Sequence, residues 1–141
     1  MIGEKILGAW ELESFIATLE DGRQVSPFGR HPEGSIVYTR GYVSVNMARG
    51  GRARDHDVPY HASGDDVAGP LARNYMAYSG PYRIDEARQV ITHDFRFCLD
   101  PALVGTLQER HARLYDDKLE LTVKQSVGTM PSTLIWRRVS D

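Results

Sequence analysis

The sequence predicts an all-β domain in which eight antiparallel strands close into an up-and-down barrel, with one helix near its mouth. Three observations support this fold class. Several stretches alternate apolar and polar residues with the period of two that is typical of strands with one buried face. Short turn sequences follow most of these stretches, so strands that are neighbours in sequence should pair antiparallel. The strands number about eight, which is enough to close a barrel around one small ligand.

Length and composition limit the possible functions. The chain has 141 residues, which we expect to form a single domain over residues 1–141. A net charge of −2 gives no basic patch that would indicate nucleic acid binding. The single cysteine, Cys98, excludes a disulfide framework and a cysteine-based zinc site. No apolar run approaches the roughly 18 residues of a membrane span, and the N-terminus lacks a signal-peptide pattern. We therefore expect a cytoplasmic protein without a membrane partner.

The expected strands follow one another along the chain. Residues 7–16 form the first strand, with Trp10 as a structural plug at the closed end, and residues 133–139 form the last strand, after a turn at Gly128–Pro131. For residues 42–47 the sequence does not decide which face points inward. Val43, Val45 and Met47 suit a core, but the alternate residues could line a cavity that contains a few polar groups. The other expected strands are residues 35–38, 77–84, 89–97, 106–115 and 119–123.

Residues 49–63 form the longest irregular segment. Such a loop either covers a binding site or is a mobile connection, and the sequence leaves both readings open. Residues 65–76 follow as the expected helix, with an acidic residue to cap it and an apolar stripe at helical spacing. Gly69-Pro70 weakens the middle of this helix, so it could begin only at Pro70. Its stripe could pack on the barrel or close one end of it.

The stretch Val90–Phe97 contains the histidine on which the functional question depends. Alternation places Ile91, His93, Phe95 and Phe97 on one apolar face. A histidine on such a face is either a satisfied core residue or a group that meets a ligand. Burial would lower its pKa and favour the neutral imidazole, which can accept or donate a proton.

Several short motifs resemble one known family. The opening Leu7–Leu12 resembles the Gly-x-Trp start of lipocalins, and Leu134–Val139 is similar to their closing strand, in which a basic residue packs near the first-strand tryptophan. The family pattern of bacterial and fungal lipocalin-like domains is similar to four further segments of this chain: Tyr38–Val45, Tyr75–Tyr82, Val90–His93 and Val104–Thr106 followed by Arg110. The chain departs from that pattern at Glu109-Arg110-His111, which leaves the place of His111 open.

The resemblance implies an up-and-down barrel around an apolar cavity, without a single function. Relatives with such barrels in natural-product pathways act as cyclases or other cofactor-free enzymes. We therefore expect a protein that binds a small, largely apolar metabolite and acts on it without a cofactor, as a cyclase or isomerase. The alternative is a non-catalytic carrier, or a resistance protein that sequesters the same kind of compound.

The expected catalytic residues are His93, as acid or base, and Arg110, which would polarise a carbonyl group. Arg110 points inward if Leu114 does, and a buried guanidinium must be paired with a carboxylate of the protein or with an anionic or carbonyl group of a ligand. Tyrosines supply apolar wall plus one hydrogen bond, which suits a cavity. The expected substrate-binding residues are Tyr38, Tyr78, Tyr82, Phe95, Phe97 and Gln108.

The sequence contains no motif for a metal or a phosphate-bearing cofactor. Asp55, His56, Asp57 and His61 have the residue types of a metal site, but their spacing matches no known pattern, so we interpret them as a solvated loop. The expected partner is a small apolar or mixed-polarity metabolite, with no nucleic acid, and a homodimer stays open.

Overall fold

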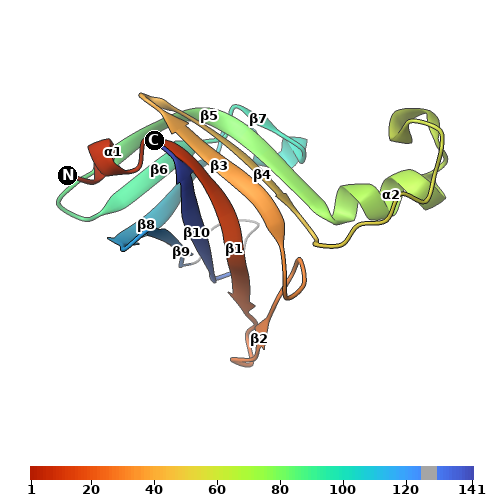
Figure 1. Ribbon diagram of the computed structural model, residues 1–141, viewed down its shortest axis with the longest axis horizontal. Coiled ribbons are helices and arrows are strands. Elements are labelled where there is room, and N and C mark those ends of the chain that lie inside the picture. Colours follow the sequence, from red (N-terminus) through yellow and green to blue (C-terminus); the bar gives the residue numbers. More distant parts are fainter. Residues whose placement is uncertain (125–129) are drawn as a thin grey trace.

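The protein folds into a closed antiparallel barrel, described here from a computed structural model for residues 1–124 and 130–141 (Figure 1). Eight strands form its wall: β1 (Gly8–Thr18), β3 (Glu33–Thr39), β4 (Tyr42–Ala48), β5 (Tyr75–Asp85), β6 (Val90–Asp94), β8 (Leu107–Tyr115), β9 (Lys118–Val123) and β10 (Ser132–Ser140). Pairing of β10 with β1 closes the sheet. The predicted fold class is therefore confirmed, and closure leaves these eight strands without a free edge.

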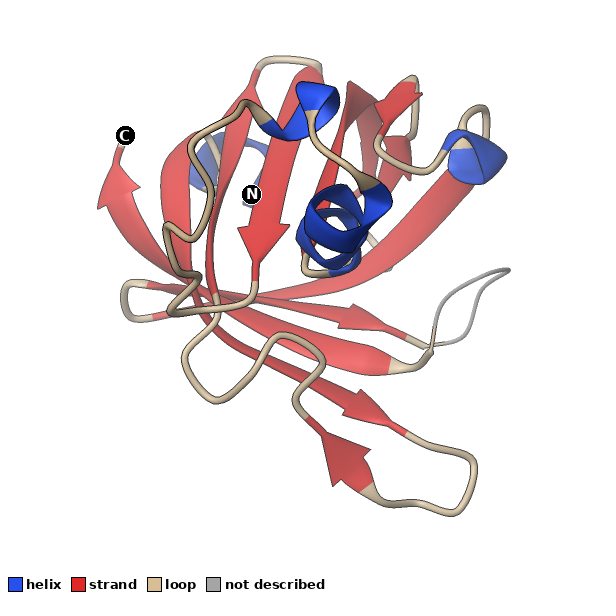
Figure 2. Ribbon diagram, turned by 90° about the vertical axis from the view of Figure 1, so that its right-hand side faces the viewer, coloured by secondary structure: helices blue, strands red, loops and turns tan. Residues whose placement is uncertain are grey.

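Small elements decorate this barrel. Two short strands, β2 (Gln24–Val25) and β7 (Phe97–Cys98), pair with β1 and β5. The helical elements are α1 (Ile2–Lys5), α2 (Asp65–Arg73) and the 3₁₀ turns η1 (Tyr60–Ala62) and η2 (Pro101–Leu103). Figure 2 shows how little helix lies beside the strands. The turn predicted at Gly128–Pro131 falls largely outside the described residues.

The helix α2 begins at Asp65 and ends at Arg73, so it is shorter than the predicted 65–76. It begins before Pro70, which lies inside it. Tyr75 and Met76 already belong to β5. None of its residues is buried, and it extends away from the barrel together with the preceding loop (Figure 1). The apolar stripe of α2 therefore does not close an end of the barrel.

Strand β4 settles the face that the sequence left open. Val43, Val45 and Met47 are buried, whereas Tyr42, Ser44 and Asn46 are exposed. The register of β4 with β3 and β5 is continuous over its whole length, which keeps the alternation intact. The apolar residues of this strand therefore face the barrel interior.

The N-terminal segment closes one end of the barrel. Ile2 and Ile6 are buried, and the Glu86 carboxylate accepts hydrogen bonds from the backbone N–H groups of Ile2 and Gly3, at 2.9 and 3.1 Å. Trp10 lies beneath this plug, where its indole Nε1–H donates to the Ile6 carbonyl oxygen at 2.9 Å. The expectation that Trp10 is a structural residue of the closed end is confirmed.

Candidate functional site

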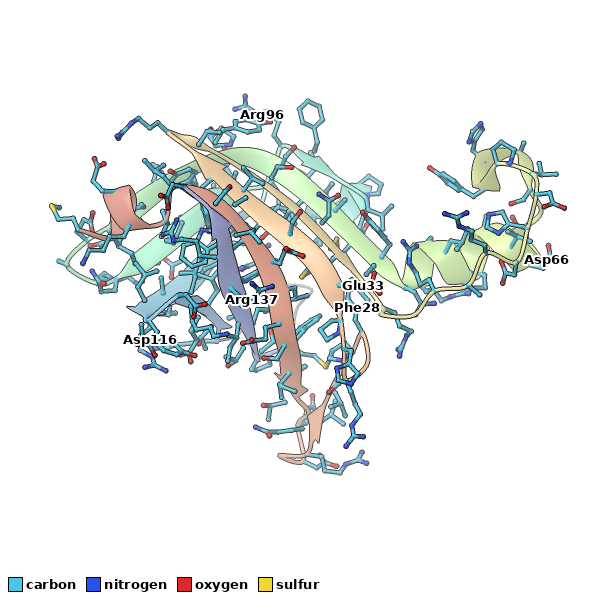
Figure 3. The ribbon with its side chains drawn as sticks, in the orientation of Figure 1. Phe28, Glu33, Asp66, Arg96, Asp116 and Arg137 are labelled. Carbon is cyan, nitrogen blue, oxygen red and sulfur yellow. The ribbon has the colours of Figure 1, made fainter. Side chains whose placement is uncertain are left out.

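A cavity of about 250 Å³ occupies the other end of the barrel interior. Its lining includes Ala17, Val123 and Ser132, at the ends of β1 and β9 and the start of β10. Phe28, from the loop before β3, also lines it (Figure 3). The volume is close to the lower end of the range for ligand pockets. The side chains that line the walls are mainly apolar, including Phe15, Ile36, Val45, Met47, Met76, Tyr78, Phe95, Leu121, Leu134 and Trp136.

The polar side chains of this cavity are few. Tyr78, Arg110, Ser132 and Trp136 contribute them among the described lining residues, and no carboxylate is included. Residues 49–63 contribute nothing to the described lining, so that loop does not cover the cavity in this structure. A mainly apolar wall with a small number of polar groups is the usual composition of a small-molecule site.

His93 lies on β6 opposite Tyr82 on one side and Gln108 on the other. It is fully buried and has two tyrosine partners: Tyr38 Oη is 2.7 Å from Nε2, and Tyr78 Oη is 2.8 Å from Nδ1. Side chains from β3, β6 and β5 thus form one hydrogen-bonded chain, Tyr38–His93–Tyr78. Only Tyr78 of these three residues is among those that line the cavity.

Burial determines the charge state of this chain. Loss of solvation, with a smaller contribution from the Arg110 charge, holds the pKa of His93 well below its usual value, so the imidazole is neutral. Burial likewise raises the pKa of Tyr38 and of Tyr78, while Arg110 partly opposes the rise for Tyr78. All three side chains are therefore uncharged near neutral pH, and a neutral imidazole has one donor and one acceptor nitrogen.

Arg110 projects inward from β8 and is 8% exposed. Its Nη1 donates to the Glu109 carbonyl oxygen at 3.2 Å, and its Cζ lies 5.9 Å from the centroid of the Phe95 ring, which stacks on Tyr78 at 3.8 Å. None of the ion pairs between described residues includes Arg110. Of the two partners that the sequence left open for this arginine, a protein carboxylate is therefore absent from the described part of the chain.

The remaining predicted residues lie outside the described lining. Tyr82 is half-buried, and its hydroxyl donates to the Thr39 carbonyl oxygen at 2.7 Å, while its ring packs edge-on against Tyr38. Gln108 is buried and donates to Thr106 Oγ1 at 2.8 Å. The structure thus brings Tyr78, Phe95 and Arg110 to the cavity wall and places Tyr38, His93, Tyr82 and Gln108 behind or beside it.

The prediction that Phe97 shares the inward face of His93 is wrong. Phe97 is 65% exposed, because β6 ends at Asp94 and β7 pairs with β5 on a shifted register. Tyr82 pairs with His93 and Ser79 with Phe97, so four steps along one strand oppose three along the other. This extra residue is a bulge, which inverts the alternation, and Arg96 lies at the outer edge of the barrel (Figure 3).

Trp136 is a cavity residue that the sequence analysis did not single out. It is 1% exposed on β10, and its Nε1 is the one buried side-chain polar atom without a hydrogen-bond partner among the described residues. Burying an unpaired donor is costly. The closing-strand motif located this tryptophan in the fold, but its missing partner depends on the backbone around it, which no sequence signal reports.

Neither a metal centre nor a spanning helix is found in the described residues. No group of three or more His, Cys, Asp or Glu side chains in residues 1–124 and 130–141 could hold a metal ion. In the Asp55–His61 loop, His56 Nδ1 lies 2.9 Å from Asp55 Oδ1, in an exposed pair. The same ranges hold no helix with the length and apolarity needed to cross a bilayer.

Comparison with known proteins gives one family and one solved structure. The profile of the lipocalin-like domain family matches residues 7–139, nearly the whole chain. The crystal structure of a mutant of the fluorescent protein UnaG aligns over 99% of both chains, with 12% sequence identity and a TM-score of 0.43. No curated protein sequence matches at a significant level.

Proposed function

Since this chain belongs to the lipocalin-like domain family, we propose that its barrel binds one small, largely apolar molecule. The observation that supports this function is the cavity of about 250 Å³, lined mainly by apolar and aromatic side chains and reached from one end of a barrel whose other end is closed. Burying the apolar surface of a ligand against such walls supplies about 25 cal/mol per Å² removed from water. Affinity in this proposal comes mainly from the apolar body of the ligand.

Arg110 and Tyr78 supply the polar contact in this proposal. Both line the cavity, and neither is engaged with a carboxylate in the described residues. A guanidinium can only donate hydrogen bonds, so its partner on the ligand is an oxygen or another acceptor. The ligand that fits is therefore mixed in polarity, with an apolar body and one acceptor group.

A second candidate function is cofactor-free cyclisation or isomerisation of the bound molecule. The observation that favours it is the buried chain Tyr38–His93–Tyr78, which ends at a hydroxyl on the cavity wall beside Arg110. A tyrosine hydroxyl and a guanidinium together can polarise a carbonyl oxygen. In this candidate Tyr78 contacts the substrate and His93 is a positioning residue behind it. Without turnover, the same site is that of a carrier or a sequestering protein.

Titration with the neutral fluorescent probe N-phenyl-1-naphthylamine tests binding in the barrel. We expect saturable binding at one site per chain. Val45→Phe, which adds bulk inside the cavity, should weaken binding, whereas Val37→Phe adds the same group to the outward face of the neighbouring strand and should not. Equal binding by the two folded variants, or no saturable binding by the folded wild-type protein, would contradict the proposal.

Turnover separates the two candidate functions. If the protein is an enzyme, Tyr78→Phe should slow conversion of a substrate by the roughly hundred- to ten-thousand-fold expected for loss of a proton-transfer group. A carrier returns every bound compound unchanged, as mass spectrometry of the extracted ligand would show. A variant with full turnover would remove Tyr78 from the catalytic step.

A further inference from the structure

Two of the four polar side chains in the described lining share a property that limits the ligand further than its apolarity does. The guanidinium of Arg110 and the indole N–H of Trp136 can only donate hydrogen bonds. Trp136 Nε1 has no acceptor in the described residues, although its side chain is almost fully buried. A cavity that holds these donor-only groups and no described carboxylate favours an acceptor-rich ligand group.

The hydrogen bonds of His93 decide what the Tyr78 hydroxyl can do. Tyr38 is buried, and its hydroxyl has no partner other than His93 Nε2 in the part of the chain that the structure describes. If Nε2 carried the proton, the Tyr38 hydroxyl would accept it, and its own proton would be left without an acceptor at a cost of about 1–3 kcal/mol. The favoured arrangement therefore has Tyr38 donating to an unprotonated Nε2.

The same tautomer sets the direction of the second bond. With the proton on Nδ1, His93 donates to Tyr78 Oη across the 2.8 Å contact. The Tyr78 oxygen then accepts from His93, and its own proton is free to point into the cavity that Tyr78 lines. Arg110 and Tyr78 thus supply donors at the cavity wall, and Trp136, another lining residue, carries the indole N–H that has no described acceptor.

The charge of the site agrees with the donor count. Arg110 brings a positive charge into a mainly apolar cavity, and no described carboxylate neutralises it. An unpaired buried charge is costly, whereas an oxyanion beside a guanidinium forms the strong, charge-assisted type of hydrogen bond.

We infer that the acceptor group of the ligand is an anionic oxygen group, a carboxylate or an equivalent oxyanion, bound by Arg110 and Tyr78 with Trp136 as a further donor. His93 is the positioning residue that turns the Tyr78 hydroxyl into a donor toward the ligand. This inference deepens the proposed binding function and rests on it. It excludes cationic head groups and predicts that neutral esters bind less well than the acids from which they derive.

Three probes with one apolar body test the head group: 2-naphthoate, its methyl ester, and 2-naphthylmethylamine. Calorimetric or fluorescence titration should give an acid that binds at least about tenfold more tightly than the ester, and an amine that binds least. Arg110→Met should abolish the preference for the acid while leaving the ester nearly unaffected. Arg110→Lys, which keeps the charge, should retain part of the preference.

The role of His93 has its own matched pair of variants. Tyr38→Phe removes the hydroxyl that donates to His93 Nε2, and Tyr38 is not among the described cavity-lining residues. The substitution should weaken the binding of 2-naphthoate several-fold more than the binding of its ester. Tyr75→Phe is the control, because it also deletes a hydroxyl that makes one side-chain hydrogen bond, to Asn46 at 3.1 Å on the outside of the barrel. Nitrogen-15 NMR of the histidine ring should report an unprotonated Nε2 in the wild-type protein. A purely structural role of His93 would not determine which ring nitrogen carries the proton.

The outcomes separate this inference from the function on which it rests. If N-phenyl-1-naphthylamine binds but 2-naphthoate binds no better than its ester, the anionic head group is wrong and the binding function stands. If no probe binds the folded protein, both are wrong. A protonated Nε2, or equal losses in Tyr38→Phe and Tyr75→Phe, would overturn the positioning role of His93.

Discussion

The closed end and the cavity each contain one tryptophan and one arginine, and the hydrogen bonding of these two pairs of residues differs. At the closed end, the Trp10 indole donates to the Ile6 carbonyl, and the Arg138 guanidinium lies 4.1 Å from the Trp10 ring while donating to the carbonyls of Leu7 and Lys5. In the cavity, Trp136 Nε1 has no described partner and Arg110 has no described carboxylate. Both indoles are 1% exposed, so burial does not distinguish them.

The difference lies in how completely each pair is satisfied. The closed-end pair donates hydrogen bonds to three nearby backbone carbonyls, which is what a structural plug requires. The cavity pair has donors without described partners, which costs stability in the free protein, and in the proposed function an acceptor on the ligand satisfies them. Sites that bind ligands commonly carry such a cost. This difference can be tested by substitutions that should change stability at one end of the barrel and not at the other.

The largest effect should come from Trp10→Ala. It removes a fully buried aromatic side chain together with the hydrogen bond to Ile6, and truncations of this kind typically lower the free energy of unfolding by about 3–5 kcal/mol. Urea denaturation measures the loss, and probe affinity per folded molecule should stay unchanged because Trp10 is not among the cavity-lining residues. A loss below about 1 kcal/mol would remove the structural role of the closed-end pair.

The two arginines should respond differently to the same substitution. Arg138→Met deletes charged hydrogen bonds to two carbonyls and should lower the free energy of unfolding by about 1–3 kcal/mol. Arg110→Met removes an unneutralised charge and fills its place with apolar volume, so the free energy of unfolding should stay within about 1 kcal/mol of wild type or rise. If both substitutions lowered the free energy of unfolding equally, the proposed difference between the two pairs would be wrong.

A smaller effect should appear in the pH dependence of stability. The pKa of folded His93 lies well below the unfolded value of about 6.5, so below pH 6.5 the unfolded chain binds a proton that the folded chain does not. The free energy of unfolding should therefore fall with decreasing pH below about 6.5, by up to ~1.4 kcal/mol per pH unit. His93→Gln, measured by urea denaturation at the same pH values, should flatten that slope by about one proton, since the other histidines are common to both proteins. An unchanged slope would mean that His93 titrates normally.

The barrel itself was predictable from the sequence because its evidence is local. Alternation in Ile91–His93 marks the inward face correctly, and in β4 it separates two faces without telling which of them is inward. Short turns then fix antiparallel neighbours. Such signals need no knowledge of the rest of the chain, so fold class and family were both accessible.

The site was only partly predictable, for two physical reasons. A bulge after Asp94 inverts the alternation and moves Phe97 to the surface. Its trace in the sequence is weak: Gly80, where a Cβ would lie 1.8 Å from the Asp94 carbonyl oxygen. The second reason is closure, because the 2.7 Å contact between Tyr38 and His93 joins residues that are 55 positions apart. Trp10 and Trp136 differ in whether the indole N–H has a hydrogen-bond partner. That difference can be read only from a structure that places the neighbouring carbonyl groups.

The chain contains two tryptophans, so its indole N–H resonances in a nitrogen-15 NMR spectrum report both ends of the barrel in a single measurement. Trp136→Phe assigns the cavity resonance. On addition of 2-naphthoate, we predict that the Trp136 resonance moves as its N–H gains an acceptor, with saturation at one probe per chain, while the Trp10 resonance stays in place. A stationary Trp136 resonance, or a shift of Trp10 in its stead, would contradict the claim that this barrel binds an anionic ligand in its cavity.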